Sequence, residues 1–174
     1  NSGTIQPGSS PGILNITGNY TQGAAGVLNI EVGGTSAVTP DFDQILISGT
    51  ATLGGTLNVS LINGFVPNKS DNFRFMTFAS RSADFTTINL PQYNSRSLLN
   101  ASAGATAYDL VGNSLLVKNL NDTGAFSVRD QIAAANAASD LDYLVFLVAG
   151  TLTPASQLPT ISNPIVIDGT SAPG

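Results

Sequence analysis

Two pairs of aspartates have a spacing that could support chemistry. Asp41 and Asp43 lie two residues apart, and so do Asp140 and Asp142. Side chains two apart on a strand point to the same face, so either pair could bring two carboxylates together. A polysaccharide hydrolase or lyase would use such a pair as general acid and base, and a calcium ion would bind its oxygens.

The local sequence favours structural roles for these acids. Asp41 and Asp43 follow Pro40, and Pro and Asp together are typical of a polar turn before a strand. Asp140 and Asp142 follow a predicted helix and supply far fewer oxygens than the roughly six to eight that calcium takes. Asp168 precedes a glycine and fits a turn. We therefore predict a non-enzyme without catalytic, cofactor-binding or metal-binding residues.

The composition points the same way. The chain of 174 residues contains no His and no Cys, so it lacks the most common general base, thiol nucleophile and transition-metal ligands. Aromatic side chains could stack on sugar rings, and the candidates are Tyr20, Tyr93, Tyr108 and Tyr143. The phenylalanines of the apolar runs fit a core instead: Phe65, Phe73, Phe75, Phe78 and Phe85. A carbohydrate or another cell-surface ligand remains an open alternative.

The charge distribution excludes other partners. Charged residues make up 10% of the chain and the net charge is -5. Nucleic acids and anionic membrane surfaces attract clustered Lys and Arg, which are scattered here. No apolar run approaches the roughly 18 residues that span a bilayer, so we expect no membrane insertion. A surface rich in Ser, Thr and Asn is common in secreted β proteins, and we expect a secreted, extracellular or cell-surface location.

Short runs of alternating apolar residues, separated by Gly, Pro and Asn, predict an all-β fold over the first hundred residues. The runs are Ile13–Tyr20, Gly26–Val32, Gln44–Leu53, Thr56–Ile62, Phe73–Phe78 and Phe85–Leu90, with weaker ones at Ala105–Val111 and Ser114–Leu120. Gly54 and Gly55 between two runs indicate a tight connection, either a hairpin or the corner of a solenoid.

One short helix is predicted near residues 127–138. Ser127 is suited to cap its N-terminus, and Asp130 is positioned to reach back to the Ser127 amide. The apolar stripe of this helix comprises Phe126, Val128, Ile132 and Ala135. The later runs Asp142–Ala149 and Pro164–Asp168 are continuous enough to predict strands buried on both faces.

Two segments of the first hundred residues resemble a known repeat. They are Gln6–Gln22, continued by Gly26–Gly34, and Asp43–Leu57. Both are similar to the repeats in passenger domains of autotransporter-like adhesins and other large bacterial surface proteins. The resemblance implies rungs of a parallel β-helix, exported to or beyond the cell surface.

A second resemblance covers the C-terminal part. Phe126–Ile132, Leu158–Ile161 and Ile165–Gly174 are similar to the opening of right-handed β-helix modules in large secreted bacterial proteins. The resemblance implies a helix that caps the first rung. We therefore predict a β-solenoid region at 1–120 and a helix-capped start of a β-helix module at 121–174. The alternative fold is a β-sandwich followed by a partial β-helix.

The expected function follows from these solenoid motifs, which carry no chemistry of their own. No sequence cap follows Asp168, and an open solenoid end recruits other strands. We expect self-association into a homopolymer, by strand addition or end stacking, as an extracellular filament, fibre or matrix. The alternatives are a stalk segment of a bacterial adhesin and a β-helix that binds or cleaves polysaccharide.

Overall fold

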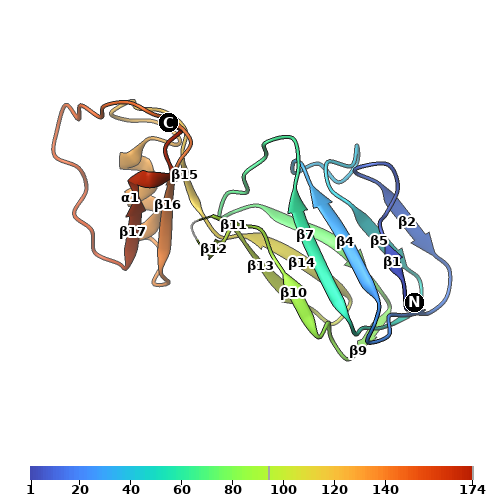
Figure 1. The fold of residues 1–174 in the computed structure, drawn as a ribbon. Coiled ribbons are helices and arrows are strands. Elements are labelled where there is room, and N and C mark those ends of the chain that lie inside the picture. Colours follow the sequence, from blue (N-terminus) through green and yellow to red (C-terminus); the bar gives the residue numbers. More distant parts are fainter. Residues whose placement is uncertain (94, 174) are drawn as a thin grey trace. The chain divides into compact units, whose positions relative to one another are not determined.

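A computed structural model describes residues 1–93 and 95–173 of the chain. Most of the described secondary structure is strand, with parallel stacked strands that form a β-solenoid and one short α-helix (Figure 1). The chain divides into two units, Asn1–Gly112 and Asn113–Gly174, and each is described separately. Gly174, which ends the second sequence match, lies outside the described residues.

Three sheets form the solenoid of the first unit, and we call them A, B and C. Sheet A contains β1 (Thr4–Ile5), β4 (Val27–Val32), β7 (Thr56–Leu61) and β10 (Thr87–Asn89). Sheet B contains β2 (Ile13–Ile16), β5 (Gln44–Ile47), β8 (Asn72–Thr77), β14 (Ala107–Gly112) and β13 (Leu99–Ala103). Sheet C contains β3 (Tyr20–Thr21), β6 (Thr50–Thr52) and β9 (Ser80–Ser82).

Each of the first three turns of the chain supplies one strand to every sheet in the order A, B, C, and a fourth turn begins with β10 of sheet A. Successive turns therefore stack in parallel, and Leu57 lies in register between Leu28 and Ile88. This is a parallel β-solenoid, as predicted, and not a β-sandwich. Gly55 follows β6 of sheet C and precedes β7 of sheet A, so the Gly54-Gly55 pair forms a solenoid corner and not a hairpin.

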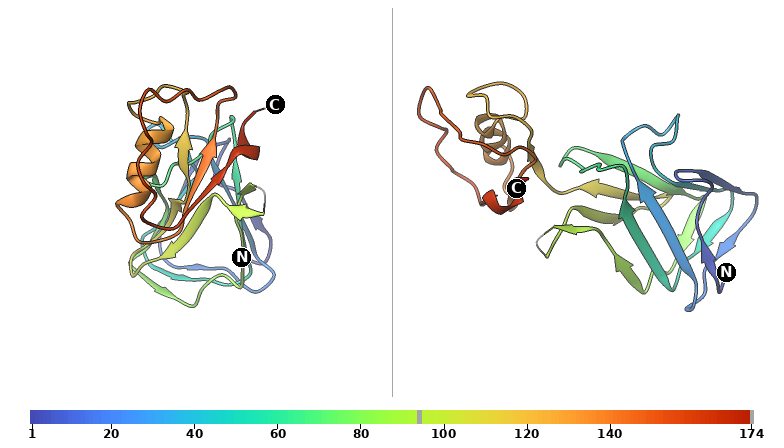
Figure 2. Two further views of the ribbon diagram at one scale, coloured as in Figure 1. Left: turned by 90° about the vertical axis from the view of Figure 1, so that its left-hand side faces the viewer. Right: turned by 45° about the horizontal axis from the view of Figure 1, so that its top comes forward.

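The three corners of the solenoid differ in the length of their connections. From sheet A to sheet B the connections are the longest, at residues 6–12, 33–43 and 62–71. From sheet B to sheet C they are short, at residues 17–19, 48–49 and 78–79. The views in Figure 2 show the loops and strands of this unit from two further sides.

The inward-facing side chains at alternate strand positions form the core of this unit. In β4 the side chains of Leu28, Ile30 and Val32 are buried, and the residues between them are half-buried. Aromatic rings fill the interior, and Phe42 packs edge-on against Phe73 with the ring centroids 5.6 Å apart. The five phenylalanines predicted as core are buried or packed against it: Phe65, Phe73, Phe75, Phe78 and Phe85.

Polar side chains form ladders on the outer faces of sheets A and C. The Asn58 amide donates to Asn29 Oδ1 at 3.0 Å, and the Asn89 amide donates to Asn58 Oδ1 at 2.8 Å. On sheet C the hydroxyl oxygens of Thr52 and Ser82 are 3.0 Å apart. Neighbouring turns are therefore joined by side-chain hydrogen bonds as well as by their backbones.

An antiparallel hairpin ends sheet B. Strand β14 pairs antiparallel with β8 on one side and with β13 on the other. Arg74 of β8 and Asp109 of β14 form a two-pronged ion pair, with Nε to Oδ1 at 3.0 Å. Tyr108 is buried against Phe75 and Phe85. A smaller hairpin, β11 (Gln92–Tyr93) and β12 (Arg96–Ser97), precedes it.

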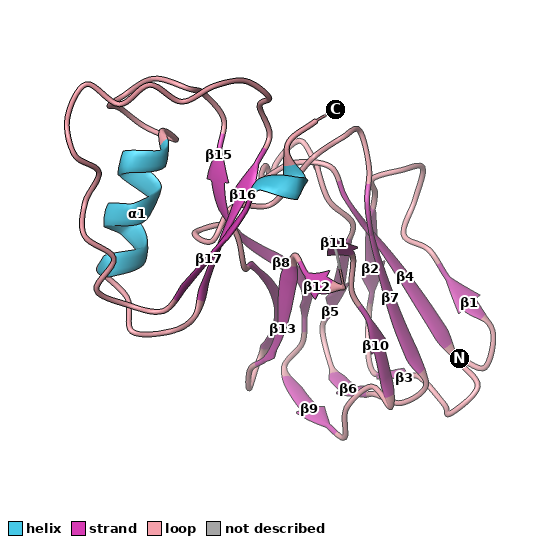
Figure 3. Cartoon of the chain, turned by 60° about the vertical axis from the view of Figure 1, so that its left-hand side comes forward, coloured by secondary structure: helices cyan, strands magenta, loops and turns pink. Residues whose placement is uncertain are grey.

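The second unit contains three parallel strands and the helix. The strands are β15 (Leu115–Val117), β16 (Asp142–Phe146) and β17 (Ile165–Asp168), followed by the 3-10 turn η1 (Gly169–Ser171). Helix α1 (Val128–Asn136) lies beside these strands (Figure 3). Its buried residues Val128, Ile132 and Ala135 form one cluster with Leu115 and Val117 of β15.

The helix begins as predicted, with one difference. Ser127 is the N-cap, and its hydroxyl accepts a hydrogen bond from the Asp130 amide. The Asp130 carboxylate accepts from the amide of Phe126 at 2.9 Å, not from that of Ser127. Phe126 has a positive φ of 62°, so the chain turns at this residue. As a result, the Phe126 amide faces the Asp130 carboxylate in place of the Ser127 amide.

Two sequence expectations differ from the structure of this unit. Strand β17 is not buried on both faces, because its residues are half-buried or exposed and Ile167 is 45% exposed. The run Ser114–Leu120, assigned to the region 1–120, contributes β15 to the second unit. This run belongs to the second unit because β15 pairs in parallel with β16, which lies some thirty residues later in the chain. The alternation of apolar residues within a strand does not identify such a partner.

Candidate functional site

The carboxylate of Asp43 is a buried link between two turns of the solenoid. Its side chain is fully buried, and its oxygens accept hydrogen bonds from the amides of Gly12 at 2.7 Å and Glu31 at 2.9 Å. Burial raises the pKa of Asp43 above its ordinary value, and the two amide hydrogen bonds oppose that rise. The Asp43 carboxylate thus holds two segments together: the connection that precedes β2 and strand β4.

The neighbouring Asp41 serves the loop that follows β4. Its Oδ2 accepts a hydrogen bond from the Ser36 amide at 3.1 Å, and its own amide donates to the Ser36 carbonyl oxygen. Asp41 and Asp43 therefore bind backbone amides of different segments. Their arrangement is suited to holding loops in place, in agreement with the turn predicted from Pro40.

The C-terminal acids are spread over separate structures. Asp140 is exposed in the loop after α1, whereas Asp142 is buried at the start of β16. Asp168 caps η1, because its Oδ1 accepts hydrogen bonds from the amide and hydroxyl of Thr170. Among the described residues, no three His, Cys, Asp or Glu side chains gather where they could hold a metal ion.

Two of the tyrosines considered for sugar stacking lie in the core. Tyr20 is 6% exposed and Tyr108 is 2% exposed, so neither offers a ring face to a ligand. Burial is the main cause that raises the pKa of both phenols, and for Tyr108 the hydrogen bond to Asp84 adds to it. Tyr93 and Tyr143 are half-buried.

A buried glutamine, which the sequence did not single out, holds one corner of the solenoid. The Gln22 amide donates to the carbonyl oxygens of Gly26, Gly54 and Thr56 at 3.2, 2.9 and 3.1 Å. Its Oε1 accepts from the Tyr20 hydroxyl at 2.7 Å. The only sequence signal was a polar residue between a strand and a glycine-rich turn, which is equally typical of an exposed loop.

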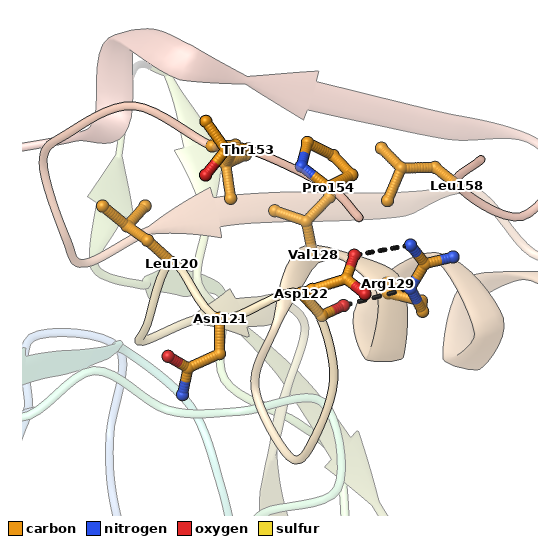
Figure 4. Close-up of a pocket in the computed structure, with 9 residues that line it drawn as sticks. Leu120, Asn121, Asp122, Val128, Arg129, Thr153, Pro154 and Leu158 are labelled. Carbon is orange, nitrogen blue, oxygen red and sulfur yellow. Dashed lines mark hydrogen bonds and ion pairs between the residues drawn. The ribbon is translucent and has the colours of Figure 1, made fainter. Parts of the chain in front are cut away.

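An ion pair fastens the long loop of the second unit. Arg129 Nη2 donates to Asp122 Oδ1 at 2.6 Å, and the guanidinium also donates to the carbonyl oxygens of Ser156 and Gln157. Figure 4 shows the two side chains facing each other below Pro154 and beside Val128. The hollow among these residues has a volume of about 10 Å³, enough for at most one water molecule. It is a packing feature and not a ligand site.

The Asp122–Arg129 pair makes the second unit sensitive to acid. The hydrogen bond from Arg129 lowers the pKa of Asp122 below its ordinary value. A lowered pKa in the folded state stabilises the fold above the unfolded pKa of about 3.9, and this contribution disappears as the pH falls through the folded pKa.

We expect Asp122→Asn to destabilise the protein at neutral pH and to differ progressively less from the wild type below about pH 3.9. Urea unfolding of both proteins across this range, followed by circular dichroism, measures the difference; an equal difference at every pH would contradict it.

Each unit has strand edges that no other described strand pairs with. In the first unit, no described strand pairs with the outer side of β1, β2 or β3 at one end, and at the other end β10, β13 and β9 are the last strands of sheets A, B and C. In the second unit, β15 and β17 each pair with β16 alone among the described residues; β15 is buried and its side chains pack against α1, whereas β17 is half-buried or exposed. We call the outer side of β1, β2 and β3 the first-rung edge and the outer side of β17 the β17 edge.

The fold defines the class of this protein as a β-solenoid. No protein-family model matches the chain, and no curated protein and no solved structure matches it either. No helix among the described residues is long and apolar enough to cross a membrane. The functional argument therefore rests on the geometry described above.

Proposed function

We propose that this chain is a non-catalytic structural protein of the bacterial cell surface or extracellular space, whose copies assemble head to tail into a filament or matrix. The observation that carries the proposal is that no described strand pairs with the first-rung edge or with the β17 edge. An uncovered strand edge presents unpaired amide and carbonyl groups that pair readily with another strand.

The apolar side chains at the first-rung edge support this proposal. Leu14 and Ile16 of β2 are half-buried and Ile13 is 41% exposed. The counterparts of Leu14 and Ile16 one turn later, Ile45 and Ile47, are buried. A further strand stacked on the first rung would bury the remaining apolar surface and pair its backbone.

The β17 edge offers the complementary half of the contact. Ile167 is 45% exposed, and the flanking residues of β17 are only half-buried. If the β17 edge of one copy pairs with the first-rung edge of the next, the contact joins two different surfaces. Such a heterologous contact propagates into a linear assembly unless its rotation closes a ring.

Negative-stain electron microscopy and sedimentation velocity test this assembly. We expect regular unbranched fibres from the wild-type chain and isolated particles from Ile167→Lys, because a lysine on an edge strand opposes strand addition. Val38→Lys is the matched control, since Val38 is 91% exposed in the connection between β4 and β5 and belongs to neither edge. Monomers of the wild-type chain at every concentration, or fibres from Ile167→Lys that match those of the control, would overturn the proposal.

A stalk segment of a surface adhesin is the second candidate. The same unpaired edges favour it, because the first-rung and β17 edges belong to parallel strands. In a longer polypeptide, neighbouring rungs would pair with these edges. The two candidates differ in their behaviour alone in solution. A stalk segment gives isolated particles under the conditions in which the filament subunit gives fibres.

A further inference from the structure

A shallow hollow lies on the outer face of sheet B. It has a volume of about 240 Å³ and crosses strands β2, β5 and β8 near their C-terminal ends. Its lining includes the side chains of Asn15, Thr17, Leu46, Ser48 and Thr77. None of the acids considered above belongs to it.

The register of the sheet sets the order of groups across the hollow. Leu46 pairs with Asn15 on one side and with Thr77 on the other, so an aliphatic side chain lies between an amide and a hydroxyl. These three positions belong to successive turns, which are about 4.8 Å apart in a β-sheet. The sheet thus presents a row of polar, apolar and polar groups along the solenoid.

The strand ends add two hydroxyls to one side of this row. Thr17 and Ser48 directly follow β2 and β5, and both are exposed. Ser48 Oγ accepts a hydrogen bond from the Gly18 amide at 2.8 Å, which fixes the rim of the hollow. Within the described part of the chain, the side chains of Asn15, Thr17 and Thr77 make no hydrogen bond and are available to a ligand.

The chemistry of the lining selects a class of ligand. All the lining side chains are uncharged, and amides and hydroxyls both donate and accept hydrogen bonds. A pyranose ring has an apolar face of C–H groups and a rim of hydroxyls, which matches an aliphatic centre flanked by an amide and hydroxyls. The net charge of -5 disfavours an anionic sugar.

We propose that this hollow binds a neutral pyranose unit of a polysaccharide, with the ring over Leu46 and its hydroxyls bound by Asn15 and Thr77. The site is open and small, so a single unit binds weakly, with a Kd of about 1 mM. The proposal does not depend on head-to-tail assembly, because the sugar would contact side chains on the outer face of sheet B, whereas assembly would use the backbone edge of β2.

Saturation-transfer difference NMR tests the site, because it observes the sugar and works whether the protein is a monomer or a fibre. The probes are cellotetraose, maltotetraose and mannotetraose, each titrated to about 10 mM. We expect transfer to the ring protons of at least one probe. Thr77→Val and Asn15→Ala should each raise its Kd about fivefold, the effect of one lost hydrogen bond.

Thr87→Val is the matched control, because Thr87 is exposed on sheet A and takes no part in the hollow. Its Kd should equal that of the wild type. Circular dichroism establishes that all three variants fold. Absence of transfer from every probe would overturn the proposal, and so would a Kd that is the same in Thr77→Val, Asn15→Ala and the control. Neither result bears on fibre formation, which microscopy measures separately.

Discussion

Replacing Asp43 with alanine is expected to lower the free energy of unfolding by about 3 kcal/mol. The substitution leaves the amides of Gly12 and Glu31 without their acceptor, and the Gly12 hydrogen bond is buried. A buried donor without a partner costs about 1 to 3 kcal/mol. The loss also separates the connection before β2 from strand β4, so both turns are destabilised together.

Urea denaturation followed by circular dichroism measures this effect. Asp41→Ala is the matched control, because the Asp41 carboxylate accepts one hydrogen bond in a half-buried loop, and we expect a loss of only about 1 kcal/mol. Equal losses in the two variants would show that the Asp43 carboxylate does not join the turns.

Substitution of Gly55 by alanine is expected to be still more damaging, with a loss of about 3 kcal/mol or more. Gly55 has a φ of +61°, and a Cβ added there would lie 2.2 Å from the Gly26 carbonyl oxygen and 2.7 Å from that of Gly23. Both contacts are to the backbone of the preceding turn. The corner therefore cannot accept a side chain without separating two stacked turns.

Gly64→Ala isolates the contribution of backbone strain. Gly64 has a φ of +68°, and no atom lies within 4 Å of the position its Cβ would occupy. We expect a loss of about 1 kcal/mol from the left-handed conformation alone. Thermal unfolding of the two variants distinguishes backbone strain from the steric clash of the added Cβ with the preceding turn. Similar losses of stability in both variants would contradict the close approach of the turns at Gly55.

The sequence predicted those elements whose signals are local. Alternating apolar residues located β4 and β7, and the serine that precedes an apolar stripe located the start of α1. Strand partners were harder, because alternation is the same in a hairpin and in a solenoid. The resemblance to exported β-helix repeats, and not the spacing, favoured parallel stacking.

The structural roles of Asp43 and Gln22 could not be predicted from neighbouring residues. Asp43 binds the Gly12 amide across 31 positions of sequence, and Gln22 binds the Gly54 carbonyl oxygen across 32 positions. Both partners lie one turn of the solenoid away. In the linear sequence each residue is merely a polar group beside a turn. The sugar hollow was equally hidden, because Asn15, Leu46 and Thr77 become neighbours only through the register of the turns.

The long connections between sheets A and B gather at one corner of the solenoid, at residues 6–12, 33–43 and 62–71. Doubling the length of a flexible loop costs only about 0.6 kcal/mol, whereas the other two corners are held by close backbone contacts. New sequence can therefore accumulate in these connections, outside Gly12 and Asp43, without altering how the turns stack. A solenoid of this design could diversify along one line of its surface while its scaffold stays constant, and the same line is where a peptide epitope could be grafted.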